Sequence, residues 1–164
     1  MTDHDIPNPA ANPIPNAVPA RISLVTLGCQ DLKALTDFYL RLGWSQARPV
    51  DAGVSFFRLA GAILSLYPEV DLAGDAMVPH ERVATEFRTR SALAINVASP
   101  PEVDAALAKA AEAGGRVVKQ GQKAFWGGYS GYFSDPEGNL WEVAHNPFWP
   151  LDERGLPEIP EGVE

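Results

Sequence analysis

The chain has 164 residues, of which 46% are hydrophobic and 21% charged, a composition typical of one soluble globular domain. Its formal net charge of −8 argues against nucleic acid or an anionic membrane surface as a partner, because either would require a positively charged surface. The single cysteine, Cys29, excludes an intrachain disulfide framework and fits a reducing compartment. No apolar run reaches the roughly 20 residues of a membrane-spanning helix. The N-terminus lacks the basic and apolar regions of a secretory signal, so we expect a cytoplasmic protein.

The chain begins with an arm and a first structural unit. Residues 1–20 hold several prolines among Asn and Ala, a composition that predicts a flexible arm. An apolar strand at 22–28 then leads to a helix with apolar residues at helical spacing, which Asp31 caps and Gly43 ends. Three further strands are predicted at 44–50, 54–59 and 62–67.

A second unit repeats this order after a charged linker at 68–91. Its first strand, 92–98, is followed by the sequence SPPE at 99–102, which predicts a capping box with proline at the first helical position. The helix ends at Gly114, and the sequence predicts strands at 116–120, 128–134 and 140–144. The Pro- and Glu-rich tail, 151–164, is expected to lie on the surface.

The two units share the order βαβββ, with module one at 22–67 and module two at 92–147. Each unit is too small to bury the face of its own sheet. We therefore predict an α+β fold in which eight strands pair into a cup with the helices outside. Residues 21–150 would form one domain, and such a cup would enclose a cavity suited to a small ligand.

The segment 125–147, FWGGYSGYFSDPEGNLWEVAHNP, predicts a hairpin with one inward carboxylate. DPEG at 135–138 suits a type I turn. In the strand after it, Glu142 lies between Trp141 and Val143, so its side chain faces the opposite side from these two. His145 is expected on the side away from Glu142 as well. Glu142 is therefore the one acidic side chain that we place in the cavity, as a general base or as a partner for a ligand cation.

Four motifs within residues 22–147 resemble the vicinal oxygen chelate superfamily, which includes glyoxalases, fosfomycin and bleomycin resistance proteins and ring-cleaving dioxygenases. The motifs are LVTLGCQDL, DFYLRLGW, FFRLAGAILSLYP and, most specifically, SDPEGNLWEVAHNP. In metal-using members, the first and the fourth strand of each unit carry one metal ligand each. The resemblance places these four positions at Leu24, at Leu64 or Ser65, at Ala92 and at Glu142.

Of the four positions, Glu142 alone keeps a donor typical of the superfamily. A catalytic divalent metal is held by about three protein ligands, so we expect neither a metal nor another cofactor. Asn96 shares the predicted face of Ala92 and is a poor neutral oxygen ligand. Besides Glu142, the residues that we expect to contact a ligand are Leu24, Leu64, Asn96, Trp126 and Tyr129.

The leading hypothesis is a metal-free, cytoplasmic protein of this superfamily that binds a small organic molecule, with Glu142 as the main polar anchor. Two enzymatic alternatives remain open: a metal-dependent lyase or dioxygenase whose ligands lie at shifted positions, and a metal-independent acid–base enzyme that uses Glu142. A purely structural role is the remaining alternative if side chains fill the cavity. The resemblance also implies a homodimer, which exposed sheet edges would allow.

Overall fold

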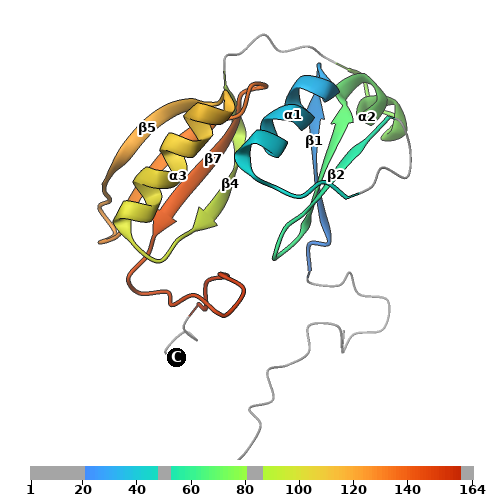
Figure 1. The fold of residues 1–164 in the computed structure, drawn as a ribbon. Helices are drawn as coiled ribbons and strands as arrows, with labels where there is room; N and C mark the ends of the chain where they lie inside the picture. The colour runs from blue at the N-terminus through green and yellow to red at the C-terminus, as the bar shows by residue number, and fades with distance from the viewer. Residues whose placement is uncertain (1–20, 48–52, 81–86, 160–164) are drawn as a thin grey trace, which may run out of the picture.

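Two successive structural units make up the part of the chain that the computed structural model describes, residues 21–47, 53–80 and 87–159 (Figure 1). The first unit comprises β1 (Leu24–Cys29), α1 (Leu32–Leu42), β2 (Ser55–Arg58), β3 (Ile63–Pro68) and α2 (Glu69–Asp75). The second unit comprises β4 (Arg88–Asn96), α3 (Pro100–Ala113), β5 (Arg116–Lys123), β6 (Tyr129–Ser134) and β7 (Asn139–His145). No helix in the described ranges is both long and apolar enough to cross a membrane.

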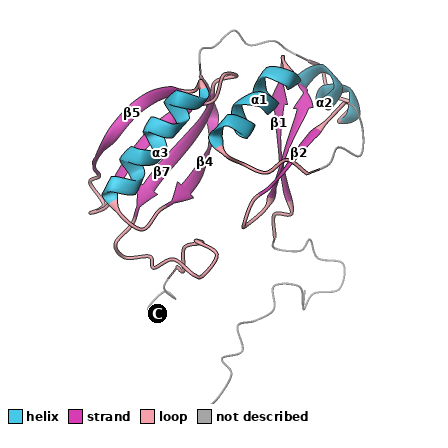
Figure 2. Cartoon of the chain, in the orientation of Figure 1, coloured by secondary structure: helices cyan, strands magenta, loops and turns pink. Residues whose placement is uncertain are grey.

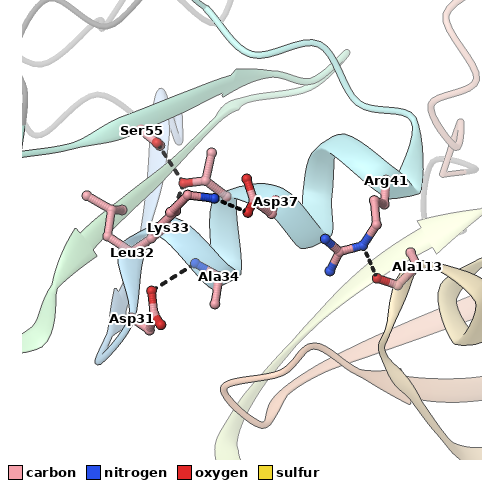
Figure 3. Close-up of polar contacts among 9 residues, drawn as sticks. Asp31, Leu32, Lys33, Ala34, Asp37, Arg41, Ser55 and Ala113 are labelled. Atoms are coloured by element: carbon pink, nitrogen blue, oxygen red, sulfur yellow. Dashed lines mark hydrogen bonds and ion pairs between the residues drawn. The ribbon is translucent and has the colours of Figure 1, made fainter.

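The ends of α1 and α3 follow from their capping residues. Asp31 accepts a hydrogen bond from the backbone amide of Ala34 at 2.9 Å, which satisfies one of the free donors of the first turn (Figure 3). Gly43 and Gly114 end the two helices with φ angles of 100° and 103°, in the left-handed region that glycine adopts without a Cβ penalty. These boundaries agree with the sequence prediction.

The predicted capping box at the start of α3 forms in a modified way. The hydroxyl of Ser99 donates to Glu102 Oε1 at 2.9 Å and does not bond a backbone amide of the helix. Glu102 Oε2 in turn accepts from the backbone amide of Ala98 at 3.3 Å. The glutamate therefore bonds the residue before the N-cap, and the serine bonds the glutamate itself, so neither of the two bonds of a standard capping box forms.

The strands form two separate open sheets (Figure 2). The first has the order β1-β3-β2, with β1 parallel and β2 antiparallel to β3. The second has the order β4-β7-β6-β5, in which only β4 and β7 are parallel. The α+β class and the two modules are confirmed. The single eight-stranded cup is wrong for the described residues, because each strand pairs within its own unit and leaves β1 and β4 at sheet edges.

The strand expected at 44–50 accounts for the missing member of the first sheet. One isolated bridge joins Gln46 to Phe57, and the amide of Ala47 donates to the carbonyl of Phe56 at 2.7 Å. This segment therefore runs beside β2 without forming a strand over its described part, and residues 48–50 lie outside the described ranges.

The linker expected at 68–91 also differs from the prediction, because it contains α2 and the beginning of β4. The helix α2 lies on the face of the first sheet that is opposite to α1. A Cβ added to Gly28 on β1 would sit only 3.2 Å from the Cβ of Glu69, so a glycine at this position allows the close approach of α2.

The hydrophobic core is shared between the two units. Helices α1 and α3 lie next to one another (Figure 1), and the aromatic side chains between helices and sheets come from both units. Phe38 of α1 lies with its ring centroid 6.4 Å from that of Phe133 on β6, and Tyr39 lies 6.0 Å from Trp141 on β7. Phe38, Tyr39 and Phe133 are at most 1% exposed. Because burial of these rings requires both units, the two modules stabilise each other.

A buried polar network also joins the units. The hydroxyl of Tyr39 donates to Asp135 Oδ2 at 2.7 Å and accepts from the indole nitrogen of Trp141 at 3.0 Å. Burial raises the pKa of Asp135, whereas hydrogen bonds from Asn139, Tyr39 and Glu137 act in the opposite direction. The predicted turn forms around this residue, because the amide of Gly138 donates to the carbonyl of Asp135 at 3.0 Å.

Candidate functional site

Glu142 lies in the middle of the face of the second sheet that is turned away from α3. Its neighbours Trp141 and Val143 are at most 3% exposed and belong to the core, so strand alternation places Glu142 on the other face, as the sequence predicts. The strand register puts one residue from each strand into a row across this face. In order from β4 to β5, the row is Ala94, Glu142, Tyr132 and Lys119.

Three members of this row, Glu142, Tyr132 and Lys119, form a polar group. Tyr132 is the register partner of Glu142, and the pKa of Tyr132 is raised, first by burial and then by the charge of Glu142. The ammonium of Lys119 lies 5.5 Å from the centroid of the Tyr132 ring and donates to Ser130 Oγ at 3.2 Å. Tyr132 therefore stays protonated near neutral pH and acts as a donor, while Glu142 offers acceptor oxygens to a bound molecule.

Alanine and asparagine side chains flank this group on the edge strand β4. Ala92, Ala94 and Asn96 pair in parallel with Leu140, Glu142 and Ala144, so they share the face of Glu142. Ala92 and Ala94 are exposed, and Asn96 is half-buried. Asn96 lies on the same face as Ala92, as the sequence predicts, and its register partner is Ala144, two residues along β7 from Glu142.

The candidate residues of module one lie on the other sheet. Leu24 pairs with Ile63 and is 41% exposed, on the face opposite to α1. Leu64 is fully buried on the α1 side, because its partner Phe57 contacts Tyr39 of that helix. Because side chains alternate along a strand, Ser65 lies on the face opposite to α1. Of the two residues that the sequence offered, Leu64 and Ser65, only Ser65 is therefore on the same face as Leu24.

Trp126 and Tyr129 do not join the group around Glu142. The hydroxyl of Tyr129 donates to Asp104 Oδ1 of α3 at 3.1 Å, so its side chain lies on the helix side of the sheet. The indole of Trp126 occupies the space over Gly128 in the connection between β5 and β6. His145 lies with Nδ1 3.3 Å from the carbonyl of Val97, which agrees with the position predicted away from Glu142.

The residues present do not fit the divalent ion that the resemblance implies. Leu24 and Ala92 carry hydrocarbon side chains, and Ser65 belongs to a different sheet from Glu142. Within the described ranges, no group of three or more His, Cys, Asp or Glu side chains could hold a metal ion. A single carboxylate does not provide the donor set of a catalytic metal site.

A cavity of about 390 Å³ lies instead between α2 and the face of the first sheet that is opposite to α1. Its polar lining comes from Thr26, Ser65 and Tyr67 of the sheet and from Asp71 and Asp75 of α2. Glu142 lines neither this cavity nor a smaller one of about 190 Å³ beside the turn at Asp135. Sequence reasoning missed the larger cavity because it treated α2 as linker, although EVDLAGD contains no β-branched run and follows directly on a proline.

The protein is thus of the α+β class. It consists of two units that each begin strand-helix-strand, and the two units share one hydrophobic core. Residues 21–143 match the model of the Glyoxalase/Bleomycin resistance protein/Dioxygenase superfamily. The chain belongs to this superfamily. No curated protein matches the sequence.

Several solved structures are similar to this chain. A glyoxalase-related enzyme from Fulvimarina pelagi is 30% identical with a TM-score of 0.75, and the match covers 85% of this chain and 98% of that chain. A glyoxalase/bleomycin resistance protein/dioxygenase from Nocardioides is 25% identical with a TM-score of 0.67, over 79% and 85% of the two chains. Lactoylglutathione lyase from Agrobacterium tumefaciens is 22% identical with a TM-score of 0.62, over 82% and 100%. The last similarity concerns the fold alone.

Proposed function

We propose that this protein is a cytoplasmic, metal-independent member of its superfamily that binds a small organic molecule on the open face of the second sheet. The observation that carries the proposal is the central position of Glu142, beside its register partner Tyr132 and flanked by exposed alanines. A ligand that covers this face would bury apolar Ala92 and Ala94 surface and meet one fixed carboxylate. An apolar surface with few oriented polar groups is the usual composition of a small-molecule site.

The same pair of residues supports acid–base catalysis as a second candidate. Tyr132 supplies a protonated phenol next to the Glu142 carboxylate, so that one group donates and the other accepts a proton at the same point. Replacement of Glu142 by Gln would then abolish turnover and spare binding, whereas a pure binding protein loses affinity.

We propose further that two chains form a dimer. In it, the face of the first sheet opposite to α1 would lie against the face of the partner's second sheet that is turned away from α3. Among the described residues, β1 and β4 have no strand partner on their outer sides. Leu24 and Ile63, on the open face beside the β1 edge, are 41% and 42% exposed. Pairing of β1 from one chain with β4 of a second copy would satisfy the free backbone groups and cover this apolar surface.

Native mass spectrometry of untagged protein tests the proposed function. We expect a species of two 17.7 kDa chains that retains an organic molecule and contains no equimolar divalent metal. The Glu142→Gln variant should lower ligand retention by about tenfold, because a hydrogen bond to a charged group contributes about 1.5–3 kcal/mol. Glu112→Gln, which removes an exposed carboxylate of α3, should retain the ligand as the wild type does. An equimolar metal, or the absence of any small molecule, would contradict the proposal.

A further inference from the structure

A cluster of aromatic side chains lies at one end of the second sheet, outside both cavities and the Glu142 group. It consists of two residues from the connection between β5 and β6 and two residues that follow β7: Phe125, Trp126, Phe148 and Trp149. Phe125 is fully exposed, Phe148 is 63% exposed, and the two tryptophans are half-buried. Contiguous exposed apolar surface marks sites of interaction, so we asked what covers this aromatic cluster.

Two glycines bring the two halves of the aromatic cluster together. The start of β6 pairs with the end of β7, so both halves leave the sheet at the same end. A Cβ added to Gly127 would lie only 3.1 Å from the ring of Phe148, and the ring of Trp126 lies directly on Gly128. Within the described ranges, neither ring stacks on another aromatic ring. The two rings therefore rest on consecutive glycines and keep apolar surface free for a further contact.

The beginning of β1 lies at the same end of the molecule as the loop that follows β7 (Figure 1). This loop, residues 150–158, comes directly after the aromatic cluster and is closed by backbone pairing. Its Leu156 contacts the β2–β3 turn, because a Cβ added to Gly61 would lie 3.4 Å from Leu156 Cδ2. At the end of this turn, the amide of Ile63 donates to the carbonyl of Ser23 at 3.1 Å, just before β1. The N-terminal arm therefore joins the described chain one loop away from the aromatic cluster.

The amino-acid sequence of the arm suits an aromatic surface. It contains no glycine and five prolines: Pro7, Pro9, Pro13, Pro15 and Pro19. Proline-rich segments favour polyproline II, and they dock on aromatic surfaces at a low cost in conformational entropy. At about 3.1 Å per residue, residues 7–19 can span about 37 Å. The two legs of the intervening loop are about 10 Å wide, so the arm is long enough to cross the loop and reach the aromatic cluster.

We propose that the N-terminal arm docks on the aromatic cluster of its own chain as a polyproline II segment. The proline rings pack against Phe125, Trp126 and Phe148, and this contact removes apolar ring surface from water. Because residues three apart share a face in polyproline II, the apolar side chains of Ile6 and Val18 lie on the same face as Pro9 and Pro15. The contact needs neither Glu142 nor a second copy, and it therefore goes beyond the function proposed above.

Nuclear Overhauser contacts measured by NMR in the full-length protein test this docking. We expect contacts between the δ protons of the arm prolines and the ring protons of Trp126 and Phe148. A mixture of isotope-labelled and unlabelled chains identifies the chain to which the arm belongs, because isotope-filtered spectra report only contacts between chains. We expect no such contacts between arm and cluster. Contacts between chains would assign the arm to a second copy, and either this result or the absence of any contact between arm and cluster would overturn the proposal.

Variants of the aromatic cluster test its part in the docking. The amide signal of Ile14 reports the docked fraction of the arm, and a synthetic peptide of residues 1–20 gives its undocked position. Phe148→Ser should lower the ratio of docked to undocked arm by about tenfold, because it removes a large apolar contact. The control, Val70→Ser, removes an apolar side chain of similar exposure, 62%, from α2 and should leave the ratio unchanged. The indole signal of buried Trp141 verifies the fold of each variant. A wild-type ratio in Phe148→Ser, or an equal loss in Val70→Ser, would also overturn the proposal.

Discussion

Tyr39 is the residue on which the buried contact between the two units depends most directly. Its hydroxyl is bonded to Asp135 of the β6–β7 turn and to Trp141 of β7. We expect Tyr39→Phe to lower the free energy of unfolding by about 1–3 kcal/mol, because it leaves a buried acceptor and a buried donor each short of a partner. Urea unfolding followed by tryptophan fluorescence measures this change.

Tyr129→Phe is the matched control at the residue scale. It also removes a tyrosine hydroxyl that donates to an aspartate, but the partner, Asp104, is exposed on α3. Water can replace that hydrogen bond, so the unfolding midpoint should hardly move. Equal losses in the two variants would show that burial of the Tyr39 network is not what stabilises the contact.

At the scale of single elements, the helix ends and α2 differ in their response to the same substitution. Gly43→Ala should cost about 1–2 kcal/mol, because a Cβ is strained at a φ of 100° although no atom lies within 4 Å of it. Gly74→Ala should instead stabilise by up to about 1 kcal/mol, since Gly74 lies inside α2 with free space for the Cβ. Comparison of the two unfolding midpoints tests both signs, and a stabilised Gly43→Ala variant would contradict the assigned cap.

The element scale also explains which parts of the fold and of the site the sequence predicts. Asp31, Gly43 and the turn at 135–138 act on their own backbone, so local patterns identify them. Helix α2 has seven residues and depends on tertiary packing beside Gly28, so the proline before it and the absence of a β-branched run are weak signals by themselves. The position of Glu142 follows from alternation along one strand. The choice between Leu64 and Ser65 does not, because a shift of one residue exchanges the two faces.

At the scale of the whole molecule, the edge strand β4 is the proposed contact with a second copy. The amide of Val97 donates to the carbonyl of Ala144, so alternation turns the amide of Ala94 away from β7 toward the free edge. Ala94→Pro removes this outward donor and should convert the dimer to a monomer, since proline is tolerated on an edge strand but blocks pairing there. Analytical ultracentrifugation measures the change, and circular dichroism should show that the sheets persist. A variant that stays dimeric would place the contact elsewhere.

The structure has two separate sheets in place of the expected eight-stranded cup, and the reason lies in how whole sheets pair. Local patterns define the strands, but they do not specify whether a sheet edge meets its counterpart in the same chain or in another one. Within one chain the helix sides of the two units already pack against each other through Phe38, Tyr39 and Phe133. The face of each sheet that is opposite to α1 or α3 therefore does not take part in the contact between the two units.

The aromatic layer between α1 and β6–β7 has a consequence for dividing the chain. Each unit contributes rings that the other unit shields from water. Either unit produced without the other would leave these rings in contact with solvent, so we expect a cut between the two units to promote aggregation of both fragments.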